Sequence, residues 1–392
     1  MFLLRGYKFK LKVNLSQGVT LNQWIGTNRC LYNIAFMQRT MNHYKEHKIT
    51  YESQAEELPV LKKEFPWMKE PPSQTLQQTL KNLDTAFRRF FKGQSKFPKT
   101  KKKHQEFGIK FPTPKSIVLI PSSNPKKGLV ELPKIGVLRF RKSREIEGEL
   151  RSCTISKGVD GFYISFLCRI QREDPIQIQK SIGIDRGVVH TLAFSHAMDG
   201  VFFKDLPVIR LKWIEEKIER LQRKLSLRIR FSRNWKKIKK KIGNLHHKIA
   251  CIRRDFLWKV ARAVTKNHGF IVIEDLKTKN MTKSASGTIE EPGRNVAQKS
   301  GLNRAILRQG WHMFSVMLGH KAEEFGSVVI KVDPKYSSQE CSECHFASKE
   351  NRLEQSVFFC KKCQHEENAD KNAAKTILAR GRRVIALKAK AG

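Results

Sequence analysis

The chain has 392 residues and 40% hydrophobic content, which suffices for two or three packed units and excludes a disordered polymer. Lys and Arg number 77 against 36 Asp and Glu, giving a formal net charge of +41. A folded chain repels itself at this charge unless a polyanion neutralises it, so we expect an extended nucleic-acid partner. A membrane-surface protein is the alternative, but no apolar run is long enough to span a bilayer, and the apolar run at 2–4 is too short for a signal peptide. We expect a cytoplasmic protein.

The first half predicts a β unit that carries a helical insert. Residues 7–15 alternate as a strand does, and 20–44 switch to helical spacing. Apolar residues at three- and four-residue steps predict an amphipathic helix over 73–92, with Ser73 as its N-cap. From 107 to about 175, short β-type runs are separated by Gly, Pro and Asn. The expected segments are strands over 1–18, a helical insert over 19–105 and a β unit over 106–177.

The second half, 178–392, predicts an α/β unit interrupted by a helical hairpin over 207–268. One apolar strand ends at Asp185, and another ends at Glu274. Between them, apolar residues recur in alternating steps of three and four, which is the spacing of an antiparallel helix pair. The predicted core positions of the hairpin are Ile214, Ile218, Leu221 and Leu225 in the first arm and Trp235, Ile238, Ile242, Leu245, Ile249, Ile252 and Phe256 in the second.

Two basic clusters are candidate nucleic-acid-binding surfaces. One lies in a Pro-containing connector and the other on the second arm of the hairpin. Each cluster could simply be solvated, one as a linker and the other as a helix face. The net charge makes a phosphate-binding surface an equal alternative for both. The candidate residues are Lys99, Lys101, Lys102 and Lys103 in the connector and Lys236, Lys237 and Lys240 on the hairpin.

Four of the eight cysteines are clustered, and their spacing is that of a zinc ribbon. Cys341 and Cys344 form one CxxC pair, and Cys360 and Cys363 form another after a gap of fifteen residues. Each pair places two thiolates on one tight turn, so two turns complete a tetrahedron around Zn²⁺. Four thiolates leave no open position for a catalytic water, which predicts a structural metal within a ribbon over 338–366.

Three acids lie on separate elements. Asp185 and Glu274 end apolar strands, and Asp370 opens an alanine-rich helix. Each has an ordinary explanation: an aspartate often begins a turn, a strand end reaches solvent, and Asp370 is a good helix N-cap. Together they fit carboxylates that converge on two divalent metal ions for phosphodiester cleavage. Carboxylate oxygens suit Mg²⁺, with Mn²⁺ as the alternative ion.

These motifs resemble the TnpB family of transposon-encoded, RuvC-type nucleases related to type V CRISPR nucleases. The resemblance rests on GIDRGV around Asp185, IVIEDL around Glu274, and KVDPKYSSQECSEC followed by CKKCQHEENADKNAAK around Asp370. It implies an α+β multidomain protein with a β-barrel-like wedge, a helical recognition insert, and an RNase H-like nuclease domain split by the hairpin and the ribbon.

The resemblance also implies activity and partners. The three acids are then catalytic, in an endonuclease that binds a guide RNA from its own mobile element and cleaves double-stranded DNA beside a short flanking motif. A guided repressor or accessory transposition protein without cleavage is the alternative, although such a protein is expected to lose at least one acid. A transposase performing strand transfer is a third, which lacks support because no paired-histidine metal site with a nucleophilic tyrosine is visible. Either a monomer or a homodimer is compatible with the sequence.

Overall fold

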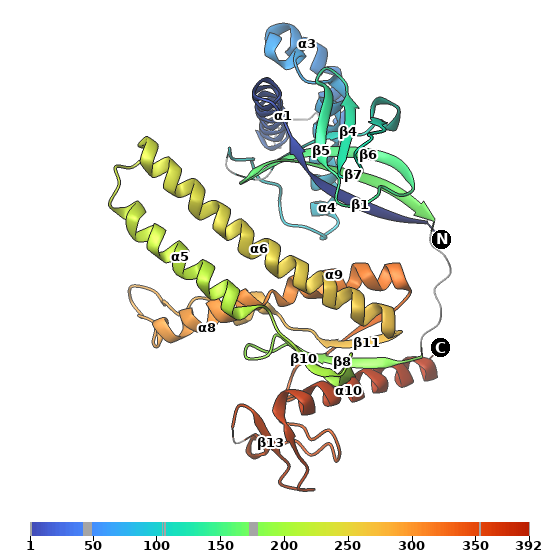
Figure 1. Ribbon diagram of the computed structural model, residues 1–392, viewed down its shortest axis with the longest axis vertical. Coiled ribbons are helices and arrows are strands. Elements are labelled where there is room, and N and C mark those ends of the chain that lie inside the picture. The colour runs from blue at the N-terminus through green and yellow to red at the C-terminus, as the bar shows by residue number, and fades with distance from the viewer. Residues whose placement is uncertain are drawn as a thin grey trace. The chain divides into compact units, whose positions relative to one another are not determined.

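The structure is a computed structural model that describes residues 2–41, 49–103, 105, 107–171, 179–352 and 354–391 (Figure 1). Its internal contacts divide the chain into two compact units, Met1–Arg172 and Glu173–Gly392. Among the described residues, no helix has both the length and the apolar character that a membrane span needs.

The first unit is built on a seven-stranded antiparallel sheet in the order β2-β6-β7-β1-β5-β4-β3. Strand β1 joins its two halves, because it pairs first with β7 and then, at Leu11 and Lys12, with β5. In the strand order of the described residues, β2 and β3 are edge strands, so barrel-like closure stays a prediction. The strands are β1 (Phe2–Lys12), β2 (Gly108–Phe111), β3 (Val118–Ile120), β4 (Lys127–Leu132), β5 (Gly136–Arg141), β6 (Glu149–Gly158) and β7 (Gly161–Gln171).

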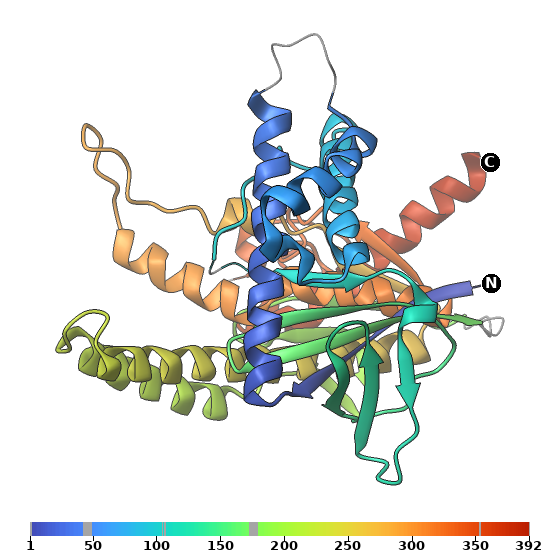
Figure 2. The same cartoon turned by 90° about the horizontal axis from the view of Figure 1, so that it is seen from above.

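In the chain, helices α1 to α4 come between β1 and β2, and the long α1 packs beside α4 (Figure 2). Leu31 of α1 and Leu76, Leu80 and Leu83 of α4 form their shared core, which confirms the predicted amphipathic helix. The Ser73 N-cap is wrong: Pro72 holds the cap position, and the Ser73 hydroxyl accepts a hydrogen bond from Lys62 instead. The helices are α1 (Leu15–Met41), α2 (Tyr51–Glu56), α3 (Leu58–Glu64) and α4 (Ser73–Phe91).

The second unit contains a five-stranded sheet in the order β10-β9-β8-β11-β12. The pairs β10–β9 and β9–β8 are antiparallel, whereas β8–β11 and β11–β12 are parallel. Three antiparallel strands followed by two parallel ones form the RNase H-like sheet expected from the sequence. The strands are β8 (Ser181–Asp185), β9 (Leu192–Met198), β10 (Val201–Lys204), β11 (Phe270–Glu274) and β12 (Val328–Val332).

Helices cover both faces of this sheet. Ile271 and Ile273 of β11 pack on one face with α6 and α9, and Val272 between them packs on the other face with Ile377 of α10. This alternation is the period-two pattern of a strand buried on both sides. Gly183 on β8 permits close packing, because a Cβ there would lie 2.2 Å from a backbone oxygen of α10. The helices are α5 (Val208–Ser226), α6 (Arg233–Asn267), α7 (Thr278–Met281), α8 (Val296–Gln309), α9 (Trp311–Phe325) and α10 (Ala369–Ala391).

Helices α5 and α6 form the expected hairpin, which extends away from the sheet (Figure 1). Ile214 and Ile218 of α5 pack against Ile249 of α6, with Leu245 and Ile252 at the margin of this core. Trp235 was predicted as a core position, and this is wrong: it lies at the turn between the helices, where it contacts Phe231 and Lys239.

Candidate active site and metal centre

The strand pairing places Asp185 and Glu274 side by side. Strands β8 and β11 are parallel, and their last recorded register pair is Ile184 with Ile273. The next residue of each strand is therefore one of the two acids. Because the carboxyl ends of parallel neighbours meet at the same edge of a sheet, both carboxylates lie at this edge.

Asp370 comes to the same edge from α10. The ordinary explanation for this residue, a helix N-cap, is not what the structure shows. Asn368 does the capping: its Oδ1 accepts hydrogen bonds from the backbone N–H of Asp370 at 3.0 Å and of Lys371 at 3.3 Å. The Asp370 carboxylate is thereby left for other contacts, and the guanidinium of Arg352 lies 3.7 Å from it.

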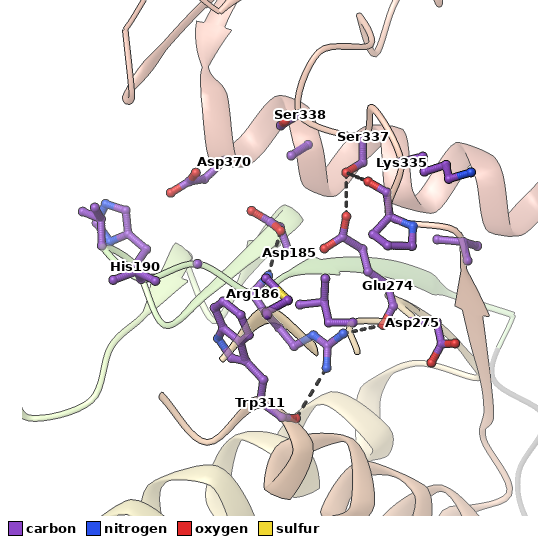
Figure 3. A pocket seen from close by; sticks show the side chains of 18 of the residues that line it. Asp185, Arg186, His190, Glu274, Asp275, Trp311, Lys335, Ser337, Ser338 and Asp370 are labelled. Carbon is purple, nitrogen blue, oxygen red and sulfur yellow. Dashed lines mark hydrogen bonds between the residues drawn. The ribbon is translucent and has the colours of Figure 1, made fainter. Parts of the chain in front are cut away.

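One open cavity of about 1410 Å³ is lined by all three acids (Figure 3). Asp185 lies between Asp370 and Glu274 in this view, and the Glu274 carboxylate points toward Ser337. Burial, together with repulsion from the other two acids, raises the pKa of Asp185 to about 7. Burial also raises the pKa of Glu274 and of Asp370. Neighbouring cations, Arg352 for Asp185 and Asp370 and Arg186 for Glu274, oppose this effect without reversing it.

A divalent cation fits this donor set. Buried carboxylates that resist ionisation are stabilised as anions by a bound cation, and their oxygens are the ligands that Mg²⁺ prefers. The three do not form a closed cage: within the described part of the chain, the four cysteines are the one group of three or more metal-ligating side chains whose ligand atoms all lie within 4.8 Å of one another.

Two residues that the sequence reasoning missed hold the acids in position. The buried guanidinium of Arg186 donates hydrogen bonds to the Glu274 backbone carbonyl and to the Ser315 hydroxyl, the latter at 2.7 Å, so it ties the end of β8 to β11 and α9. The Ser337 hydroxyl donates to Oε1 of the buried Glu274 at 2.5 Å and lowers its pKa against the effect of burial. Arg186 lies within the GIDRGV motif, but its partners are distant in sequence.

The four cysteines come together as predicted. The Sγ atoms of Cys341 and Cys363 are 3.6 Å apart, and those of Cys344 and Cys360 are 3.5 Å apart. The two CxxC turns share one geometry, because the residue after each second cysteine, His345 or Gln364, has a φ of 59° and donates its N–H to the carbonyl of the first cysteine. Such a cluster of thiolates fits a tetrahedral Zn²⁺ ion.

The ribbon is fastened directly to the helix that carries Asp370. Asn372, fully buried on the first turn of α10, accepts a hydrogen bond from the Ser342 N–H at 2.9 Å and donates one to the Glu340 carbonyl at 2.8 Å. Both partners flank Cys341. The position of the third acid is therefore coupled to the fold of the first cysteine turn.

The predicted basic residues are mostly exposed. Lys99, Lys102 and Lys103 are exposed in the connector, and all three hairpin lysines are exposed on α6. Lys101 differs: Asn33 of α1 bonds to its backbone, and its ammonium lies 5.2 Å from the centre of the Tyr32 ring. It therefore has a structural role that the sequence did not indicate.

An RNase H-like sheet, three acids at one sheet end and a four-cysteine ribbon before the third acid define a RuvC-type nuclease. Family models agree along the chain: a "Helix-turn-helix domain" matches residues 1–48, a "Probable transposase" model matches 165–285, and a "Cas12f1-like, TNB domain" matches 311–377.

Among curated proteins, the "Putative RNA-guided DNA endonuclease InsQ" of Escherichia coli K12 is 41% identical over 98% of this chain and 94% of its own length. A "Putative RNA-guided DNA endonuclease" of Streptomyces pristinaespiralis is 27% identical over 96% of this chain and 89% of its own. The chain therefore belongs to the TnpB-type family of InsQ.

A solved structure shares the fold. The cryo-EM structure of a Cas12f1–sgRNA–target DNA complex matches with a TM-score of 0.62 and 14% identity, covering 93% of this chain and 83% of the other. At this identity the match establishes the mixed α/β fold alone.

Proposed function

We propose that this protein is an RNA-guided, metal-dependent DNA endonuclease of a mobile element, with Asp185, Glu274 and Asp370 as its catalytic acids. The observation that carries the proposal is the convergence of three acids from β8, β11 and α10 on one open cavity, where burial raises the pKa of each. Two observations support guide RNA and target DNA as the partners. The family relatives are described as RNA-guided DNA endonucleases, and the chain carries a net charge of +41.

The three acids would hold divalent metal ions, Mg²⁺ or Mn²⁺. When bound, such ions make a water molecule nucleophilic and stabilise the oxygen that leaves during phosphodiester hydrolysis. The chain's own residues fix the geometry. Arg186 holds the ends of β8 and β11 together, and Ser337 orients the Glu274 carboxylate.

Cations beside the acids would bind the phosphates of the target DNA. Lys331 and Lys335 line the same cavity as Arg352, so the scissile strand meets positive charge on the approach to the acid cluster. The four cysteines would hold a structural Zn²⁺, which keeps the ribbon folded and, through Asn372, keeps the beginning of α10 in place.

The first experiment expresses the gene with its native flanking DNA, purifies the protein and sequences the RNA that accompanies it. A discrete RNA that overlaps or adjoins the 3′ end of the gene supports a guided nuclease. A heterogeneous mixture of host RNA contradicts guidance and leaves a metal-dependent nuclease. Light scattering of the RNA-loaded protein decides between a monomer and a homodimer.

The second experiment tests the acids with a matched pair of variants. Glu274→Gln removes a buried carboxylate, and Asp275→Asn removes the adjacent, exposed one, whose side chain lies 3.9 Å from the Lys331 ammonium. We expect the first variant to lose cleavage and keep target binding, and the second to keep both. Cleavage by Glu274→Gln at the wild-type rate would contradict the catalytic assignment, and target binding without cleavage by the wild type would favour a guided binding protein in which the acids do no chemistry.

A further inference from the structure

The turn of the helical hairpin presents apolar side chains to solvent. Leu227 and Ile229 are each 84% exposed, and Phe231 is 61% exposed. Arginines occupy both positions between them. We call residues 227–235 the hairpin tip. Single exposed apolar side chains are ordinary, but three within five residues mark a surface that contacts a partner.

Aromatic rings and cations lie against one another at the hairpin tip. The ring centres of Phe231 and Trp235 are 5.4 Å apart. The Arg230 guanidinium lies 5.1 Å from the centre of the Phe231 ring, and the Lys239 ammonium lies 4.6 Å from that of Trp235. Phe231 has a φ of 69°, in the left-handed region that a bulky residue rarely adopts. An aromatic ring held exposed on a strained backbone is typical of a residue that contacts a ligand.

The charge around the tip identifies the ligand as an anion. From Arg220 to Arg254, 35 residues contain fourteen Lys and Arg and no Asp or Glu. Helix α6 begins with no acid in its first turn, although the amide dipoles at a helix N-terminus favour negative charge there. Phosphate groups would neutralise both. Rings for base stacking beside cations for phosphates are the combination by which proteins bind unpaired nucleotides.

The place of the tip favours the guide RNA over the cleaved DNA. Helix α5 begins three residues after Asp205, which bonds to His190 at the cavity wall. Its 19 residues then extend about 28 Å from that wall. The tip is thus remote from the acids that would cut DNA. A guide RNA joins the protein before any target does, so it can cover these apolar side chains from the outset.

We propose that the hairpin tip binds the guide RNA, with an unpaired base stacked on Phe231 and the neighbouring arginines on its phosphates. This inference rests on the proposed function, since it names the partner of a second surface in the same guided nuclease.

The test compares Phe231→Gly with Phe231→Tyr. Glycine adopts the left-handed conformation without strain, so Phe231→Gly removes the ring and preserves the turn. Phe231→Tyr keeps both ring and strain and is the matched control. Phe231→Asn repeats the deletion with another residue that tolerates this backbone conformation. Each protein is expressed with the native flanking DNA, and its thermal unfolding is checked against the wild type.

Two readouts are applied to the copurified RNA. Acylation of 2′-hydroxyls by 1-methyl-7-nitroisatoic anhydride reports which nucleotides are constrained. We expect one or a few unpaired nucleotides to be unreactive with the wild type and Phe231→Tyr, and to become reactive with Phe231→Gly. Dissociation of labelled RNA should be about 5- to 150-fold faster from Phe231→Gly, the range for loss of one base–aromatic stack.

The outcomes separate this proposal from the function on which it rests. No discrete RNA with the wild type would overturn both. A discrete RNA whose acylation pattern and dissociation are unchanged in Phe231→Gly would overturn the tip assignment alone. An unchanged RNA pattern with altered permanganate reactivity of target-DNA thymines would assign the tip to DNA. An unchanged RNA pattern with loss of a dimer by light scattering would assign it to a second copy of the chain. Either result overturns the proposal.

Discussion

Replacing Asn372 by alanine should uncouple the zinc ribbon from the third acid. The substitution leaves the Ser342 N–H without its acceptor, which costs about 1–3 kcal/mol, and removes the bond to the Glu340 carbonyl, worth about 0.5–1.5 kcal/mol. The carbonyl keeps a second donor, the Thr376 hydroxyl at 3.3 Å, so it adds no further penalty. The expected loss is about 2–4 kcal/mol, or a melting temperature about 5–15 °C lower for a unit of this size.

Three measurements check this reasoning. Thermal unfolding gives the stability, a chromogenic chelator gives the rate of zinc release, and a guided cleavage assay gives the activity. Zinc release should accelerate, and cleavage should fall about 100-fold, as expected when a catalytic group shifts by about 1 Å. Asn244→Ala, on an exposed position of α6, is the control and should change none of them. An Asn372→Ala variant with wild-type melting, zinc release and cleavage would refute the coupling.

Further expectations concern charge and metal. Asp185→Asn should abolish cleavage, retain target binding and, in metal-free buffer at pH 8, melt above the wild type, because it relieves repulsion among three carboxylates. The folded pKa of Asp185, about 7, exceeds the unfolded value of about 3.9. Between these two pH values the folded, metal-free wild type binds one more proton than the unfolded chain, so its stability falls as the pH rises toward 7. Equal pH dependence of stability in the wild type and the variant would contradict this. Omitting Mg²⁺ should stop cleavage reversibly, whereas zinc removal by 1,10-phenanthroline should lower the melting temperature in a way that Mg²⁺ does not reverse; recovery on Mg²⁺ addition would argue against a structural zinc. RNA affinity should fall steeply with salt, with a log–log slope of several units, and a slope near zero would contradict the role of the basic surface.

Much of the fold and the candidate site was predictable from local pattern. CxxC spacing brings thiolates together because each pair needs only its own turn, and the four cysteines meet as predicted. The two strand-end acids were predictable because apolar runs mark β8 and β11, although their adjacency depends on the parallel pairing. Helical spacing located the part of the hairpin core where α5 and α6 bury one face against each other, from Ile214 and Ile218 to Ile249, whereas the predicted positions Leu221, Leu225 and Ile238 lie outside this core.

The residues whose roles the sequence did not predict share one physical cause: each role depends on contacts that only the folded chain brings together. Trp235 fits the spacing of the hairpin core, but it lies on the first turn of α6, beside the turn between the helices. Its neighbours there belong to the hairpin tip and not to the hairpin core. Asp370 looks like an N-cap, yet Asn368 two residues earlier already bonds the free N–H groups. The role of Arg186 requires Ser315 and Glu274, which are 129 and 88 residues away in the chain.

The order in which the acids occur in the chain sets the order in which the parts of the candidate site are synthesised. Asp185 leaves the ribosome 185 residues before Asp370, an interval of about 10–40 s at the usual bacterial and eukaryotic rates of elongation. The hairpin, with its run of fourteen cations, is finished within this interval, whereas the acid site lacks a member until both cysteine turns and α10 have been made. During synthesis the basic surface of the hairpin is therefore complete before the third acid has been added.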